Sequence, residues 1–242
     1  MHSAWNVERK WGNKKLDKVA DYTMAFVASF TLPLVILIAI CYSIFSSPQY
    51  YLSYNQKLTD NKFEESLKLD INVVEESLTN MLMYVKGENE NPQTTFEVNH
   101  QKVEFFNERE ISHLSDIRAK MQTGKTIWGF MALFGIACMA LLVFRQRVHL
   151  VARLYIVTLG VEIFVSFVIA VIYALNPLYM ITLFHRLFFE GNTWIFNPAT
   201  DRIIYFFPNG LYADMIIKAL LVLLVEITCC VIGSVFVLRT KS

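Results

Sequence analysis

Four long apolar stretches divide this sequence, and they constrain its fold more than any motif does. They cover residues 23–45, 127–144, 154–175 and 219–238. A helix needs about 20 apolar residues to cross a hydrocarbon core of about 30 Å, and each stretch is close to that length. Charged residues make up only 18% of the chain, against about a quarter in soluble domains. The sequence therefore predicts an all-α integral membrane protein with four transmembrane helices.

Basic residues gather on one side of these four spans. They are concentrated in segment 1–22, in the connection 145–153 and in the tail 239–242. The positive-inside rule assigns such segments to the cytoplasm. We therefore predict that both termini are cytoplasmic, and that segments 46–126 and 176–218 are extracytoplasmic.

The first outside segment is long enough to hold a folded insertion. Apolar residues recur at helical spacing from Asp60 to Val85, which predicts a helix capped by Asp60 and ended by Gly87. Short alternating apolar stretches from Thr94 to Phe105, on either side of Asn99 and His100, predict a hairpin. The segment thus reads as an extracytoplasmic α+β insertion after the first span.

A second helix of this insertion is predicted to begin after Asn107. Asn107 and Glu110 have the spacing of a capping box, in which each side chain accepts a hydrogen bond from the other residue's backbone N–H. We expect this helix to run to about Gln122, shortly before the second span.

The second outside segment is unusually rich in aromatic residues, which suggests that it lies in the headgroup region of the membrane. Two interpretations stay open: simple anchoring in an aromatic belt, or a lipid-binding floor for a site at the outer leaflet. Ten of the chain's 34 aromatic residues lie between Asn176 and Tyr212: Tyr179, Phe184, Phe188, Phe189, Trp194, Phe196, Tyr205, Phe206, Phe207 and Tyr212.

Two of the five histidines are candidates for chemistry. His113 lies on the predicted helix that leads to the second span, and His185 lies at the outer end of the third span. The predicted topology places both near the same membrane interface. Histidine exchanges protons near neutral pH, so two converging histidines suit acid and base roles. The alternative is that each histidine makes an isolated hydrogen bond.

Metal, disulfide and nucleic-acid functions find little support in the sequence. Glu110 and His113 match half of a di-iron carboxylate motif, but the second copy that such sites need is missing. A net charge of +1 on a helical bundle argues against nucleic-acid binding. All four cysteines lie in apolar runs, which argues against a disulfide framework or a zinc site: Cys41, Cys138, Cys229 and Cys230.

Two acidic residues lie near the middle of predicted spans, Glu162 in the third and Glu226 in the fourth. A carboxyl group at that depth is unfavourable and marks a function or a buried partner. Four spans without a repeat or a broken-helix pair argue against a transporter. We expect structural hydrogen bonds inside the bundle, or a protonated acid.

Two segments that contain the histidines have distinctive motifs. The first is Phe105-Phe-Asn-Glu-Arg-Glu-Ile-Ser-His-Leu-Ser-Asp-Ile-Arg118; the second is Phe184-His-Arg-Leu-Phe-Phe189, followed by Trp194, Asp201, Ile203, Ile204, Phe207 and Pro208. These motifs resemble those of the lipoprotein intramolecular transacylase (Lit) family of Gram-positive bacteria. Leu114 and Ile117 are mild departures, at positions where the family more often has Met and Val. The order of elements also agrees, so the resemblance covers nearly the whole chain.

The resemblance implies an enzyme of the bacterial cell membrane with its active site at the extracytoplasmic face. Such an enzyme moves the sn-2 acyl chain of a diacylglyceryl-cysteine lipoprotein to the α-amino group of the same cysteine, which leaves a lyso-form lipoprotein. Its partners are the lipidated N-terminus and membrane lipid. No metal or cofactor is implied.

The resemblance also suggests roles for individual residues. His113 and His185 are expected to act as acid and base, with the division between them left open. Glu110 or Asp116 is expected to orient His113. The remaining supporting residues lie in the two motifs: Asp201 with Arg186 or Arg202 to position the second motif, Trp194 to hold acyl chains, and Arg118 at the end of the first motif.

Two other classes of function remain open on the sequence. One is a different outer-leaflet enzyme, a lipid ester hydrolase that uses the same histidines. The other is a non-catalytic membrane accessory protein that binds lipid through its aromatic segment.

Overall fold

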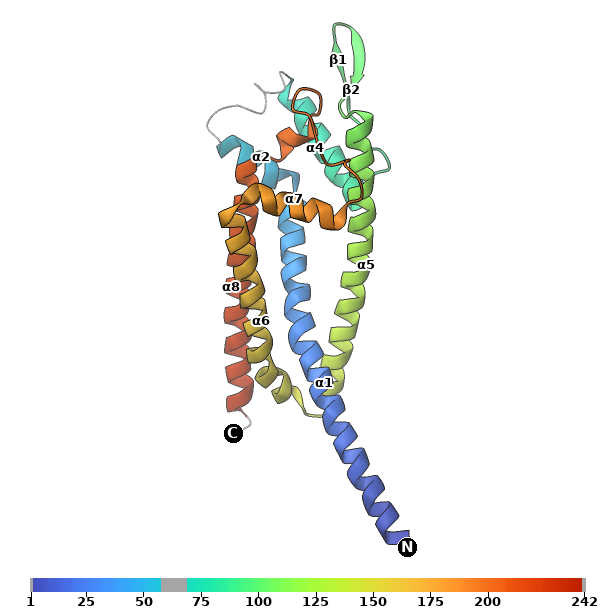
Figure 1. Ribbon diagram of the computed structural model, residues 1–242, viewed down its shortest axis with the longest axis vertical. Helices are drawn as coiled ribbons and strands as arrows, with labels where there is room; N and C mark the ends of the chain where they lie inside the picture. The colour runs from blue at the N-terminus through green and yellow to red at the C-terminus, as the bar shows by residue number, and fades with distance from the viewer. Residues whose placement is uncertain (1, 58–68, 241–242) are drawn as a thin grey trace. The chain divides into compact units, whose positions relative to one another are not determined.

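The computed structural model describes residues 2–57 and 69–240 (Figure 1). Its contacts divide the chain into two compact units. Unit 1 consists of Met1–Ala39, Trp128–Ile169 and Leu220–Ser242, and unit 2 consists of Ile40–Ile127 and Ala170–Ala219. Both segments predicted to lie outside the membrane therefore belong to unit 2.

Four long helices supply unit 1: α1 (His2–Phe45), α5 (Glu108–Phe144), α6 (Val148–Leu175) and α8 (Asn209–Arg239). Each is long and apolar enough to cross a membrane, which confirms the four predicted spans. α1 begins and α8 ends at the end of unit 1 that also holds the connection between α5 and α6 (Figure 1).

The helix α5 does not end near Gln122 as predicted. It continues without a break to Phe144, over 37 residues or about 55 Å. The reason is local, because residues 119–126 contain no proline and Gly124 alone is not enough to end a helix. All charged residues of α5 precede Ile127. The part of α5 that can cross the membrane is therefore Ile127–Phe144.

Unit 1 is held by close packing of small and apolar side chains. Its buried cluster is made by residues of α1, α5 and α6: Ala25, Ala28, Cys138, Leu142 and Leu150. Gly135 lies directly against the Thr31 side chain, with no room for a Cβ atom. Such small contact residues let membrane helices approach closely.

The mid-span acids of unit 1 do not make the hydrogen bonds that we expected. One carboxyl oxygen of Glu162 and both of Glu226 are buried without a hydrogen-bond partner in the described part of the chain. Their burial is therefore not compensated by bonds within the bundle.

Unit 2 contains the predicted hairpin. Strand β1 (Thr95–Val98) pairs antiparallel with β2 (Gln101–Glu104). Asn99 and His100 form the two-residue turn with φ angles of 52° and 63°. Positive φ at both turn positions is the geometry that joins tightly twisted strands.

The helix before the hairpin, α4 (Ile71–Lys86), is shorter than the predicted one. Asp70 caps it by accepting a hydrogen bond from the backbone N–H of Asn72, whereas the predicted cap Asp60 lies outside the described residues. Gly87 ends α4 as predicted, with a φ of 80° that favours glycine.

The segment predicted as an interfacial loop, 176–218, is partly helical. It contains α7 (Pro177–Phe188), the 3₁₀ turn η1 (Ile203–Phe206) and the first turns of α8. Asn176 caps α7 by accepting a hydrogen bond from Tyr179 N–H, and proline occupies the first helical position. His185 therefore lies on a separate short helix, and not at the end of the third span.

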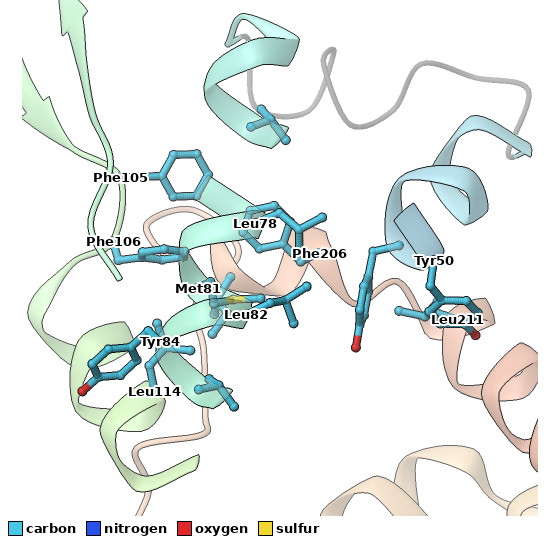
Figure 2. Close-up of a cluster of buried hydrophobic side chains, with 14 of the residues drawn as sticks. Tyr50, Leu78, Met81, Leu82, Tyr84, Phe105, Phe106, Leu114, Phe206 and Leu211 are labelled. Carbon is cyan, nitrogen blue, oxygen red and sulfur yellow. The ribbon is translucent and has the colours of Figure 1, made fainter. Parts of the chain in front are cut away.

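The core of unit 2 joins elements that are distant in the sequence. Figure 2 shows side chains of α4 packed between residues at the base of the hairpin, the start of α5 and the η1 region. α2 (Pro48–Lys57) adds Tyr50 and Tyr51. The aromatic rings of Phe105 and Phe206 stack with centroids 5.7 Å apart. This core holds the first turns of α5 against the segment that follows α7.

Candidate active site

His113 is positioned by the capping box at the start of α5. The backbone N–H of Asn107 donates to the Glu110 carboxylate at 2.7 Å, and the N–H of Glu110 donates to the Asn107 side chain at 3.1 Å. This confirms the predicted capping box. His113 follows one turn later and is only 3% exposed. The cap therefore fixes the first turn of α5 directly before a buried imidazole.

His185 is oriented by its own helix, α7. Its Nδ1 lies 2.8 Å from the carbonyl oxygen of Ile181. A carbonyl oxygen can only accept, so this contact requires the proton on Nδ1. In the neutral ring the lone pair is then on Nε2. This tautomer leaves Nε2 of His185 able to accept a proton.

The fold brings the two histidines together, as predicted. Their ring centroids are 6.0 Å apart. Three aromatic rings surround this histidine pair: Phe189 lies 5.0 Å from the His113 ring and 5.6 Å from the His185 ring, Phe196 lies 5.3 Å from His113, and Trp194 stacks on His185 at 4.8 Å. The pair therefore lies in an apolar, aromatic environment.

His113 is held in its neutral form. Burial, and then the nearby charge of His185, lower its pKa to about 4, although Asp116 acts in the opposite direction. Nδ1 of His113 is buried without a hydrogen-bond partner, and no other buried side-chain nitrogen or oxygen in the described part of unit 2 lacks one. Buried polar groups are nearly always paired, so this exception needs an explanation, and a role in catalysis next to His185 is one.

Glu110 was expected to orient His113, but its carboxylate accepts hydrogen bonds from backbone N–H groups of the described chain instead. Its second carboxylate oxygen accepts from the backbone N–H groups of Arg202 and Ile203, at 2.5 Å and 2.6 Å. Burial raises the pKa of Glu110, whereas its three backbone hydrogen bonds act to lower it. Glu110 therefore joins the start of α5 to the η1 turn, and so links the two sequence motifs.

Asp201 closes the same junction from the other side. It accepts from the Asn107 side chain at 2.7 Å and from the Asn197 N–H at 2.6 Å. Burial acts to raise the pKa of Asp201, but these bonds and one from Thr200 outweigh it, and the pKa lies below its ordinary value. The loop that carries Phe196 to His113 is therefore firmly held.

Two more of the predicted supporting residues, Arg202 and Asp116, hold loops of unit 2 in place. Arg202 donates to the carbonyl oxygens of Glu104 and Phe105 at 2.9 Å and 2.6 Å, and so ties the η1 turn to β2. Asp116 accepts from the Thr193 hydroxyl at 3.1 Å, beside Trp194. Asp116 thereby holds the residue before Trp194, and Arg202 holds the η1 turn against the base of the hairpin.

Two candidate arginines are not part of this arrangement. Arg118 donates to the Asn89 carbonyl at 2.8 Å and pairs with Glu90 at 2.9 Å, and so supports the loop after α4. Arg186 is exposed on α7 and makes no hydrogen bond or ion pair within residues 2–57 and 69–240.

Sequence reasoning missed several residues of the site. Asn107 and Phe189 lie within the two motifs, but the sequence predicted a cap for Asn107 and no contact with the histidines for Phe189. Phe196 was noted only for its aromatic ring. The density of aromatic residues was the available signal, but spacing alone does not tell which rings face the histidines.

Within the described chain, no three His, Cys, Asp or Glu side chains gather closely enough to hold a metal ion.

Comparison with known proteins identifies the family. Residues 25–212 match the family model of the lipoprotein intramolecular transacylase Lit. The chain belongs to the Lit family. No curated protein matches the chain in sequence. Membership in the Lit family makes the chain an acyltransferase that acts on lipoproteins.

Solved Lit structures have the same fold. The membrane-integral Lit of Bacillus cereus aligns with a TM-score of 0.74 at 14% identity, over 91% of this chain and 97% of that chain. A histidine-to-alanine variant of that Lit aligns with a TM-score of 0.70 at 14% identity, over 95% and 98%. Because identity is low, these structures support the fold and the membrane-integral architecture only.

Proposed function

We propose that this Lit-family protein transfers the sn-2 acyl chain of a diacylglyceryl-cysteine lipoprotein to the α-amino group of the same cysteine. The observation that carries the proposal is the histidine pair, with centroids 6.0 Å apart in an aromatic enclosure. The pair also contains Nδ1 of His113. Among the described residues of unit 2, this is the one buried side-chain nitrogen or oxygen without a hydrogen-bond partner.

The reaction needs acid and base groups but no net supply of protons. The amine nitrogen attacks the ester carbonyl, a C–N bond forms, and the C–O bond to the glyceryl oxygen breaks. The amine loses a proton and the glyceryl oxygen gains one. Amine and ester belong to one molecule, so proximity lowers the barrier without any further reactant.

The tautomers suggest how the histidines divide the work. His185 has its lone pair on Nε2 and takes the proton of the attacking amine, while the Ile181 carbonyl stabilises the resulting cation. His113 stays neutral because its pKa is about 4, and it donates an N–H to the developing oxyanion. His185 then returns its proton to the glyceryl oxygen.

The surface of α7 suits a lipid substrate. Phe184, Leu187 and Phe188 are exposed on this helix, and Trp194 stacks on His185. Acyl chains would lie along these side chains.

The charge pattern of the sequence assigns unit 2 to the extracytoplasmic side of the membrane. An impermeant thiol reagent should then label Glu97→Cys and Asn192→Cys in intact cells, in a background without the natural cysteines. Protection of both positions would contradict this orientation.

Substitution of the histidines tests the chemistry. His113→Ala and His185→Ala should each lower the rate about 100-fold or more, because acid–base catalysis contributes about 10²–10⁴. Substrate and product are isomers of equal mass, so the assay reads the loss of the free amine and the appearance of an alkali-stable acyl chain. His100→Asn, in the exposed hairpin turn, is the matched control.

The outcomes separate the alternatives. Near-normal activity of either alanine variant would exclude the two-histidine mechanism. Released fatty acid together with a free amine would identify an ester hydrolase. A wild-type protein that leaves diacylglyceryl termini unchanged would point to a non-catalytic accessory role.

A further inference from the structure

The substrate of the proposed reaction has a polypeptide as well as a lipid, and this inference rests on that proposed function. Residues that follow the lipidated cysteine extend about 3.3 Å each. The first few therefore lie within about 10 Å of the reacting amine. Their backbone N–H and C=O groups need hydrogen-bond partners. Along the apolar side chains of α7 these groups would have no partners, so either water or a polar surface beside the histidine pair has to supply them.

Unit 2 has a depression at such a place. Arg109, Asn192, Thr193 and Ile195 line it. Thr193 and Ile195 directly flank Trp194 in the sequence, and Asn192 lies two residues before it. The Trp194 ring stacks on His185 at 4.8 Å. Neighbouring Cα atoms are about 3.8 Å apart. The depression therefore begins one or two residues along the chain from Trp194, the residue whose ring contacts His185.

The lining of the depression can hydrogen-bond to a peptide. Arg109 is 56% exposed, and one of its nitrogens donates to the Ile195 carbonyl at 3.3 Å. A guanidinium has five N–H donors, and the rest of them make no hydrogen bond within the described chain. The exposed amide of Asn192 both donates and accepts, as a peptide group does.

The charge of the depression fits a peptide better than an anionic headgroup. Arg109 is the one cation in the lining, and it lies 3.9 Å from the Asp201 carboxylate. This ion pair offsets its charge. Ile195 adds an exposed apolar side chain. A site of this kind offers donors to neutral carbonyl oxygens more than it offers net positive charge.

We propose that this depression binds the first residues of the lipoprotein polypeptide after the lipidated cysteine. Arg109 and Asn192 donate to backbone carbonyl oxygens of that segment, and Ile195 contacts one of its side chains. The depression would thereby direct the polypeptide away from the membrane while the acyl chains lie along α7.

The test compares two substrates in nanodiscs of phosphatidylglycerol. One is a diacylglyceryl-cysteine amide, and the other is a diacylglyceryl lipopeptide with several further residues. Wild-type protein should have a higher kcat/KM for the lipopeptide. Arg109→Gln and Asn192→Ala should each lower the ratio of the two kcat/KM values, by about tenfold for Arg109→Gln, through KM. Lys120→Gln replaces an exposed cation of the same helix, and it should leave the ratio unchanged.

Each failure has its own signature. If Arg109→Gln lowers kcat/KM equally for both substrates, the residue is only structural and the inference is wrong. If its effect is equal for both substrates and disappears in phosphatidylcholine nanodiscs, the depression binds an anionic headgroup, and the inference is again wrong. A wild-type protein that converts neither substrate would instead contradict the proposed function.

Discussion

Two buried glutamates, one in each unit, show opposite treatment of a carboxyl group. Glu110 in unit 2 is 1% exposed, and its oxygens accept three backbone hydrogen bonds. Glu226 in unit 1 is 8% exposed, and neither of its oxygens has a hydrogen-bond partner among the described residues.

This difference shows that the two carboxyl groups contribute differently to fixing segments of their units in place. Charge-assisted hydrogen bonds to backbone groups are strong and directional, so Glu110 sets the position of a loop. An unpaired buried carboxyl adds no such bond, so Glu226 fixes no segment of unit 1, whose buried cluster consists of apolar and small side chains. His113 is an intermediate case. Its Nδ1 is buried and unpaired, whereas the other buried side-chain nitrogen and oxygen atoms among the described residues of unit 2 have partners.

The largest expected effect follows the loss of Glu110. Glu110→Ala leaves the backbone N–H groups of Arg202 and Ile203 buried without an acceptor, so we expect a loss of about 3 kcal/mol in the free energy of unfolding and of nearly all activity. Thermal unfolding in detergent and the amine-loss assay measure both. Glu108→Ala, an exposed acid in the same turn, should change neither. An unchanged melting temperature in Glu110→Ala would show that the comparison is wrong.

A smaller effect should appear when the pH is lowered. The folded protein holds the pKa of His113 near 4, whereas the unfolded chain has a value near 6.5. Below pH 6.5 the unfolded state binds a proton that the folded state does not, so stability falls as the pH drops toward 4. Melting temperatures at pH 7 and pH 5 should therefore differ by less in His113→Asn than in wild type. An equal difference in both would show that the buried ring does not resist protonation.

The smallest effect is expected at Glu226. A buried carboxyl without a hydrogen-bond partner costs free energy, and an apolar residue of similar size removes this cost. The free energy of unfolding of Glu226→Leu should thus lie within about 1 kcal/mol of the wild-type value, or above it. Leu223→Ala, at a buried apolar position of the same helix, is the control for sensitivity and should lose about 2–3 kcal/mol. A marked loss in Glu226→Leu would mean that the carboxyl has a partner or a role in the membrane.

Features that depend on only a few neighbouring residues were predicted correctly from the sequence. The length of the apolar stretches predicted the four spans, and the capping box of Asn107 and Glu110 predicted the start of α5. The alternation of apolar and polar residues around Asn99 and His100 predicted the hairpin. The end of α5 was predicted wrongly because its polar and apolar parts follow one another without a helix-breaking residue.

The sequence by itself determined the four spans, the start of α5, the hairpin and the two histidine motifs, because these depend on local composition and spacing. Only the tertiary structure decided that Glu110 binds the backbone of Arg202 and Ile203, about 90 residues later. It alone decided which aromatic rings enclose His113 and His185. Contacts of this kind form between segments that the chain brings together on folding, and no spacing rule along the sequence encodes them.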